Sequence, residues 1–172
     1  MTISTITDRA GVNRSTFYQH YDDKDTLLAD ALESAMAGVA DTFSGDVDDA
    51  GIPVEIHLYL ALVRDQAELY RDVLGDHGSA VVTARLRRRL DAIVVGSIAA
   101  APENPYADVP LDVVSAGLSG AALGVVAAWL RRDPLPPVDD AARWMWAVVT
   151  GAGGAVAPGA AKRARPHDES RN

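Results

Sequence analysis

Residues 2–24 read TISTITDRAGVNRSTFYQHYDDK, and this stretch decides how the N-terminal part of the chain folds. Thr2 and Asn13 are residue types that cap helix N-termini, and each precedes a short segment of helical character. Gly11, between the two segments, supplies a tight turn. The stretch therefore predicts two short helices, over 2–10 and 13–21, that meet at Gly11.

The two predicted helices each have an apolar and a polar side. Ile6, Ala10, Val12 and Phe17 are expected to pack the helices across each other. The residues left at the surface are polar: Arg14, Ser15, Thr16, Tyr18, Gln19 and His20. This pattern predicts a helix-turn-helix, whose second helix enters the major groove of DNA and contacts phosphates and base edges. The alternative is an ordinary helical hairpin with a polar surface.

The remainder of the chain predicts an all-α fold. Apolar residues recur at three- and four-residue steps, and the expected helices cover 24–43, 54–70, 79–100, 111–132 and 138–150. Three parts follow: a head with its connecting helix over 1–43, a helical domain over 52–150, and a tail over 151–172. The tail is rich in Gly, Ala and Pro, then basic and polar, so we expect it to be disordered.

Composition excludes several classes of protein. The chain of 172 residues has no cysteine, which removes disulfides, thiolate catalysis and zinc fingers. A net charge of −8 excludes a protein that wraps nucleic acid over its whole surface, but it leaves room for a local DNA-binding face. The four histidines share no ligand-like spacing and no phosphate-binding loop follows a strand, so we expect no metal, cofactor or catalysis.

Targeting signals are also not expected. The first residues lack the layout of a signal peptide, and the apolar run at 111–130 is interrupted by glycines and serines. We therefore expect a cytoplasmic protein without a membrane partner.

The N-terminal stretch resembles the TetR family of bacterial transcriptional regulators. The residues that carry the resemblance are Thr2, Ile6, Ala10-Gly11-Val12, Asn13-Arg14-Ser15-Thr16-Phe17-Tyr18, His20-Tyr21 and Lys24 with Leu27-Leu28. Residues 113–134 and 138–150 are more weakly similar to the last two helices of the family. Thr7 stands where the family usually has a small apolar residue. The family also places a helix before the one that begins after Thr2, so we expect either a true start upstream of Met1 or a head without that helix.

The resemblance implies a role for each polar residue of the head. Arg14, Ser15 and Tyr18 would lie nearest the bases. The residues implied at the DNA backbone are Thr2, Ser4, Thr5, Asn13, Thr16, Gln19 and His20. Lys24 would bind a phosphate, helped by the positive end of the dipole of its helix.

The resemblance further implies a homodimer, in which the last two helices of each chain form a four-helix bundle with the partner. Small residues allow helices to approach closely, and the candidate interface residues are Gly117, Gly120, Ala121, Gly124, Ala128, Trp129 and Trp144. The alternative is that the tryptophans fill the core of a single protomer.

A small-molecule effector is the third implication. The polar and aromatic residues available to line its site are His57, Tyr59, Tyr70, His77 and Tyr106. Each also suits a half-exposed surface or core position. A run of arginines, Arg85, Arg87, Arg88 and Arg89, is interpreted first as a solvated face that pairs with acids such as Asp91, and second as a site for a phosphate or an acidic ligand.

The expected function is a ligand-responsive repressor that binds a palindromic DNA operator as a dimer. The alternative is a dimeric small-molecule-binding module that has lost DNA binding because its head is incomplete.

Overall fold

The computed structural model describes residues 2–40, 45–75, 78–101, 104 and 106–154. Within them the regular secondary structure is helical, joined by turns and loops, and one isolated bridge connects Val47 and Pro53. The helices are α1 (Ile3–Ala10), α2 (Arg14–His20), α3 (Lys24–Ala40), α4 (Val54–Asp65), α5 (Ala67–Leu74), α6 (Ala80–Ala100), α7 (Leu111–Leu130) and α8 (Val138–Gly154). The expectation of an all-α fold is confirmed.

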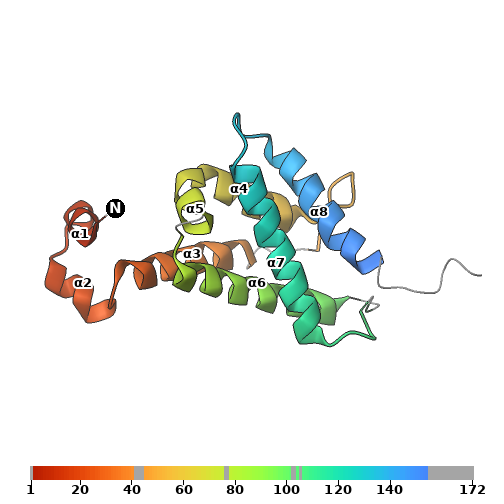
Figure 1. The fold of residues 1–172 in the computed structure, drawn as a ribbon, viewed down its shortest axis with the longest axis horizontal. Helices are drawn as coiled ribbons and strands as arrows, with labels where there is room; N and C mark the ends of the chain where they lie inside the picture. The colour runs from red at the N-terminus through yellow and green to blue at the C-terminus, as the bar shows by residue number, and fades with distance from the viewer. Residues whose placement is uncertain (1, 41–44, 76–77, 102–103, 105, 155–172) are drawn as a thin grey trace, which may run out of the picture.

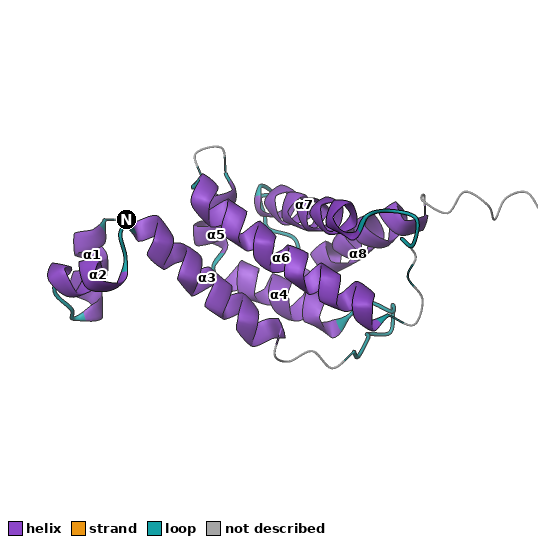
Figure 2. Cartoon of the chain, turned by 90° about the horizontal axis from the view of Figure 1, so that it is seen from below, coloured by secondary structure: helices purple, strands orange, loops and turns teal. Residues whose placement is uncertain are grey.

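Two parts are visible in the arrangement of these helices. α1 and α2, here called the head, stand at one end of the molecule (Figures 1 and 2). α3 runs from the head into the body, which comprises α3–α8, and there it packs along α6. α6 in turn packs on α7, and α7 packs on α8 and α5. The head is therefore connected to the body through a single helix.

The sequence predicted one helix over 54–70, and this prediction was wrong at Gln66. Gln66 has φ −121° and ψ 32°, which ends α4 and redirects the chain into α5. The bend buries Val63 on one side and Tyr70 on the other. The apolar spacing continues without interruption from Ile56 to Tyr70, so the sequence pattern contains no sign of the break.

The C-terminal boundary also differs from the expectation. α8 continues to Gly154, whereas the tail was expected to begin at residue 151. Residues 155–172, which include the rest of the predicted tail, lie outside the described residues.

The core of the body is built around large side chains that are almost completely buried, among them Trp129, Tyr70, Leu32 and Leu60. Trp129 also donates its indole N–H to the carbonyl of Pro136 at 2.9 Å. Its assignment as an interface residue was therefore wrong: Trp129 fills the core of its own protomer, which was the alternative considered.

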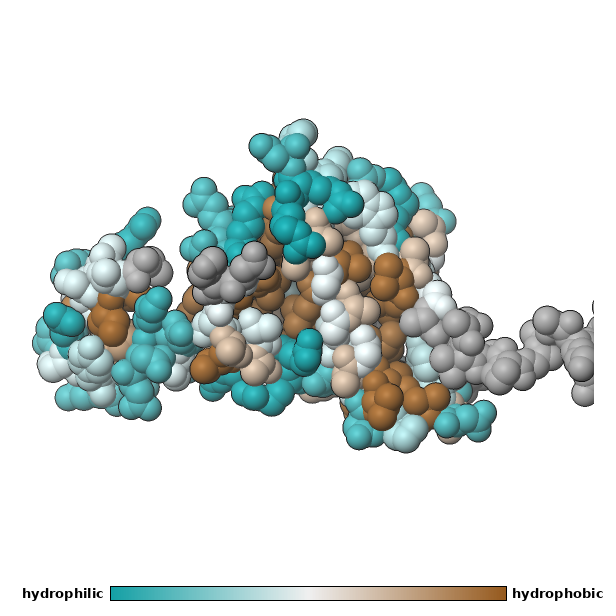
Figure 3. Space-filling model, viewed as in Figure 1, coloured by the Kyte–Doolittle hydropathy of each residue, from teal (hydrophilic) through white to brown (hydrophobic). Residues whose placement is uncertain are grey.

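α7 is long and apolar enough to cross a membrane by length and composition alone, contrary to the expectation for residues 111–130. Core helices of globular proteins pass the same test, and α7 packs against α5, α6 and α8. Apolar surface gathers over α7 and α8 in the space-filling view (Figure 3). The exposed large apolar residues of these two helices are Leu111, Val113, Trp144 and Val148.

Candidate nucleic-acid interface

The caps of α1 and α2 form as the sequence predicts. The Thr2 hydroxyl accepts from the backbone N–H of Thr5 at 3.2 Å. The Asn13 side chain accepts from the N–H of Thr16 at 2.8 Å. Each cap satisfies one of the N–H groups that a helix leaves without an intrahelical partner. The two caps therefore fix where both helices of the head begin.

Gly11 makes the turn between them. Its φ of 68° and ψ of 24° lie in the left-handed region, which glycine adopts without steric cost. Its N–H donates to Asp8 at 3.3 Å, and the N–H of Val12 donates to Thr7 at 3.0 Å. These two bonds are the Schellman pattern that ends a helix and reverses the chain. The turn sets the angle at which α2 leaves α1.

The packing between α1 and α2 differs in part from the prediction. Phe17 is buried at 6% exposure and Ile6 is half-buried, but Val12 is 43% exposed and Ala10 is also exposed. Val12 and Ala10 thus do not fill the space between the helices. Thr7, not singled out as a packing residue, is 1% exposed and donates its hydroxyl to the carbonyls of Ile3 and Ser4. Such back-bonding lets a threonine occupy an apolar position.

One side of α2 is turned to solvent. Tyr18 is 52% exposed, its ring meets the edge of Phe17 with centroids 5.3 Å apart, and the other exposed residues of this face are Arg14, Ser15, Gln19 and His20. Burial of Phe17 therefore directs Tyr18 and its neighbours outward. Arg14, Gln19 and His20 make no side-chain hydrogen bond within the described part of the chain, so their donors face solvent.

The hydroxyls at the start of α2 are engaged inside the helix. Ser15 and Thr16 both donate to the carbonyl oxygen of the Asn13 side chain, Thr16 at 3.1 Å. To donate to a phosphate, either hydroxyl must rotate away from Asn13. On α1, Thr5 and Thr2 share a hydroxyl–hydroxyl bond of 2.9 Å, and Ser4 donates to Asp8 at 3.5 Å.

α3 begins beside this face. The Asp23 side chain accepts from the N–H of Thr26 at 2.7 Å, and this bond lowers the pKa of the Asp23 carboxyl. Lys24 follows with its side chain 58% exposed and its ammonium 3.9 Å from Asp25. Lys24 is thus a solvated positive charge at a helix N-terminus, an arrangement that favours anions.

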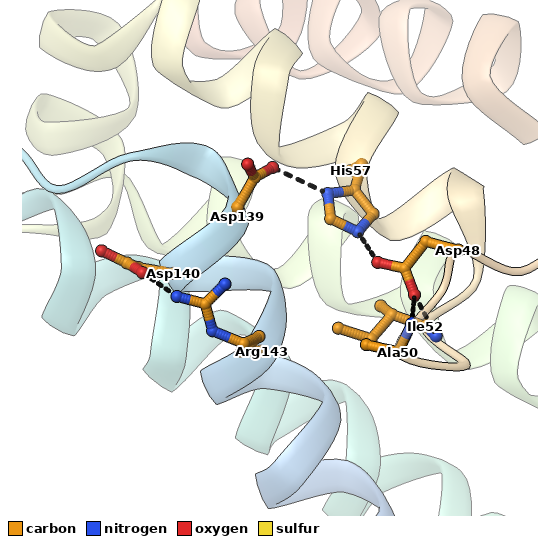
Figure 4. Close-up of polar contacts among 7 residues, drawn as sticks. All are labelled: Asp48, Ala50, Ile52, His57, Asp139, Asp140 and Arg143. Atoms are coloured by element: carbon orange, nitrogen blue, oxygen red, sulfur yellow. Dashed lines mark hydrogen bonds and ion pairs between the residues drawn. The ribbon is translucent and has the colours of Figure 1, made fainter.

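The residues expected at an effector site are not gathered in one place. The His57 imidazole lies between two carboxylates, with Nε2 3.0 Å from Asp48 and Nδ1 3.4 Å from Asp139 (Figure 4). Tyr59 and Tyr70 are buried in the core, and their hydroxyls have no partner among the described residues. Burial raises the pKa of both, that of Tyr70 to about 12. Tyr106 is half-buried in the loop before α7, and His77 lies outside the described residues.

Two of the hollows in the described part of the chain bear on these residues. One of about 410 Å³ is bordered by His57, Asp48, Asp139 and Arg143. The other, of about 710 Å³, lies between α3 and α6. Of the five residues expected to line an effector site, His57 alone borders either one.

The remaining candidate interface residues lie on α7 and α8. Gly117 and Gly124 are exposed, Ala121 and Ala128 are half-buried, and Gly120 lies against the side chain of Arg87. Trp144 is exposed, and the Arg132 guanidinium lies 4.7 Å from its ring centroid.

Comparison with known proteins gives one family match and one similar solved structure. Residues 1–31 match the family model described as "Bacterial regulatory proteins, tetR family". The fold is similar to the crystal structure of a TetR transcriptional regulator from Streptococcus agalactiae 2603V, with a TM-score of 0.53 and 22% identity, covering 87% of this chain and 81% of that one. A comparison with curated proteins gives no match.

Proposed function

We propose that the chain is a TetR-family repressor that binds a palindromic DNA operator as a homodimer and responds to a small effector. Two findings support this: residues 1–31 match the model of that family, and the fold is similar to that of a TetR transcriptional regulator. The observation that carries the proposal is the outward-facing polar side of α2. The Asn13 cap, the Gly11 turn and the buried Phe17 hold that side in one orientation.

The exposed chemistry of α2 suits DNA. Recognition helices present base-contacting residues near their N-termini, where Arg14 and Ser15 lie, with Tyr18 one turn on. Gln19 and His20 follow as phosphate donors, and Thr16 joins them once its hydroxyl rotates away from Asn13. Lys24 adds a positive charge, and Thr2, Ser4 and Thr5 lie on α1 for contacts to the backbone. We assign these residues to the DNA interface.

The dimer is proposed through α7 and α8. Symmetric two-fold contacts bury the same apolar surface on both partners, and Val148 on α8 is 46% exposed. A dimer would also set two recognition helices about 34–36 Å apart, the spacing of successive turns of the major groove. The small-faced residues Gly117, Gly120, Ala121, Gly124 and Ala128, together with Trp144, belong to this proposed surface.

A titration against DNA tests the proposal. The full chain is titrated into its own upstream intergenic duplex by fluorescence anisotropy at two salt concentrations, with a scrambled duplex as control. Tyr18→Ala and Lys24→Ala are expected to weaken binding, and Lys24→Ala to flatten the log–log salt slope by about 0.9. Arg64→Gln, which removes an exposed positive charge on α4, serves as the matched control and should leave the slope unchanged.

The same titration separates the two functions. A folded dimer that binds neither duplex would contradict the repressor and favour the alternative, a ligand-binding module that does not bind DNA. Equal affinity for the specific and scrambled duplexes would contradict a specific operator.

Oligomeric state tests the dimer separately. Val148→Glu is expected to convert the dimer to a monomer in sedimentation experiments, since it places a charge in the proposed interface. Val81→Glu changes a valine of similar exposure on α6 and should remain dimeric. A wild-type monomer, or a dimer in both variants, would refute the assignment of α7 and α8.

A further inference from the structure

The larger hollow is a groove of about 710 Å³ between α3 and α6. From α3 it is lined by one helical stripe that includes Leu27, Ala31 and Ala37, and from α6 by Arg88, Arg89 and Ala92. Tyr21, in the connection between α2 and α3, also lines it. The volume falls in the range of about 300–1,000 Å³ that is typical of small-molecule sites.

The acids of the groove already have a partner. Asp30 and Glu33 both pair with Arg85, which also donates to the carbonyl of Thr26 at 3.5 Å. Asp91, the acid that the sequence suggested as a partner for the arginine run, instead accepts from Ser119 on α7. The acids nearest in sequence therefore do not neutralise Arg88 and Arg89.

Arg88 and Arg89 form no ion pair within the described residues, and the Nε–H of Arg89 is buried without a hydrogen-bond partner there. Leaving a buried donor of a charged group unpaired is costly. An acceptor supplied by a ligand would remove this cost. Two arginines and two acids line the groove, and both acids pair with Arg85, which lies beside it, so the groove and Arg85 together carry three arginines against two acids, a local positive excess on a chain whose net charge is −8.

We propose that this groove binds a small amphipathic organic acid. Its carboxylate accepts hydrogen bonds from Arg88 and Arg89, since guanidinium groups match the geometry of a carboxylate. Its apolar portion lies along Leu27, Ala31, Ala37 and Ala92. This places the ligand away from the buried tyrosines of the core, and it is the second interpretation that the sequence allowed for the arginine run.

The groove also reaches the segment that positions the head. Tyr21 follows directly after the last residue of α2 and packs its ring 5.8 Å from that of Phe17. A ligand beside Tyr21 and α3 therefore contacts both ends of the connection between head and body. The regulatory consequence, that such a ligand changes DNA affinity, rests on the proposed function.

Calorimetric titration of the full chain with octanoate, without DNA, tests the site itself. Octanoate is expected to bind, with Arg88→Gln and Arg89→Gln each weakening it about tenfold, as the loss of one charge-assisted hydrogen bond implies. Arg87→Gln, on the same helix but with its guanidinium against Gly120 of α7, is the matched control and should bind as the wild type does. Thermal unfolding checks that each variant is folded, and Arg88, which is exposed, provides the milder substitution.

Two further probes define the ligand class. 1-Octanol has the same chain without the charge, and inorganic phosphate has charge without a chain. Both are expected to bind at least about tenfold more weakly than octanoate. Equal binding of octanol, equal binding of phosphate, or wild-type affinity in both Arg88→Gln and Arg89→Gln would overturn the proposal.

Repeating the DNA titration with saturating octanoate tests the regulatory consequence. A change in operator affinity that Arg89→Gln abolishes would support it, and an unchanged affinity would refute it. Failure of the unliganded protein to bind DNA would refute the proposed function. The calorimetric titration would still show whether the groove binds an organic acid.

Discussion

Replacing Gly11 by alanine tests how the head is built. Gly11 has a φ of 68°, and a Cβ added to it would meet nothing within 4 Å. The cost of Gly11→Ala is therefore conformational alone. The left-handed conformation costs a residue with a Cβ about 1–2 kcal/mol, and the reduced freedom of the unfolded chain offsets about 0.4–1 kcal/mol of this. We expect a net loss of about 1 kcal/mol, which is about fivefold in the equilibrium for opening the head.

Hydrogen exchange of the backbone amides of the head measures this change in the opening equilibrium. Amides of α1 and the Val12 amide, which donates to Thr7, should exchange about fivefold faster in Gly11→Ala, while amides in the core of the body keep their protection. Gly11→Asn should reduce the protection of these amides less than Gly11→Ala does, because asparagine tolerates the left-handed region.

Gly38→Ala is the matched control. Gly38 is also exposed with nothing within 4 Å of an added Cβ, but it lies inside α3 without a positive φ. Alanine at position 38 should stabilise α3 by about 0.5–1 kcal/mol. If Gly11→Ala and Gly38→Ala shifted protection in the same direction, the reasoning from backbone conformation would be wrong.

Three further perturbations concern burial and charge. Trp129→Ala should lower the free energy of unfolding by about 3–5 kcal/mol in chemical denaturation, because the side chain is fully buried; a loss below about 1 kcal/mol would contradict its core position. Thr7→Val should change the free energy of unfolding by no more than about 1.5 kcal/mol, the upper end for one intramolecular hydrogen bond, since it removes a hydroxyl that only back-bonds to Ile3 and Ser4; a larger loss would mean that the hydroxyl is required. Hydrogen bonds from Ile52 and Ala50 lower the pKa of Asp48, so its contribution is complete above the ordinary carboxyl pKa of 3.8 and is lost as the pH falls through the folded value. Asp48→Asn should therefore melt below the wild type at pH 7, with a difference that closes under acid; a difference independent of pH would refute the role of charge.

The head could be predicted from the sequence because its determinants are local. Thr2 and Asn13 cap the residues that follow within three positions, and Gly11 makes its turn through bonds to Asp8 and, by way of Val12, to Thr7. Such contacts depend on a few neighbouring residues whose types are visible in the chain. The prediction was wrong only where packing between helices decides, as for the exposed Val12.

For the body, the sequence predicts where most of the helices lie but not which side chains of different helices contact each other. The bend at Gln66 follows from packing α5 against α7, and the spacing of apolar residues does not reveal it. Trp129 suited a core and an interface equally by its chemistry, and only the arrangement of the helices decides between them. In the arginine run the partner of Arg85 is Asp30, 55 positions away on α3, rather than an acid of its own helix. The groove beside Arg88 and Arg89 depends on this same long-range pairing.

α3 joins the head to the body and also lines the groove. Its 17 residues span about 25 Å. Leu32 and Met36 anchor its second half in the core, whereas its first turn carries the head. Arg85 holds the intervening stretch to α6 at Thr26, Asp30 and Glu33. The proposed ligand would lie against this stretch, one helical turn of α6 beyond Arg85. It can change DNA binding only through different affinities for two positions of α3. Because Tyr21, just before α3, and Arg89, on α6, line the same groove, a shift of α3 relative to α6 would alter the distance between them and with it the affinity for the proposed ligand.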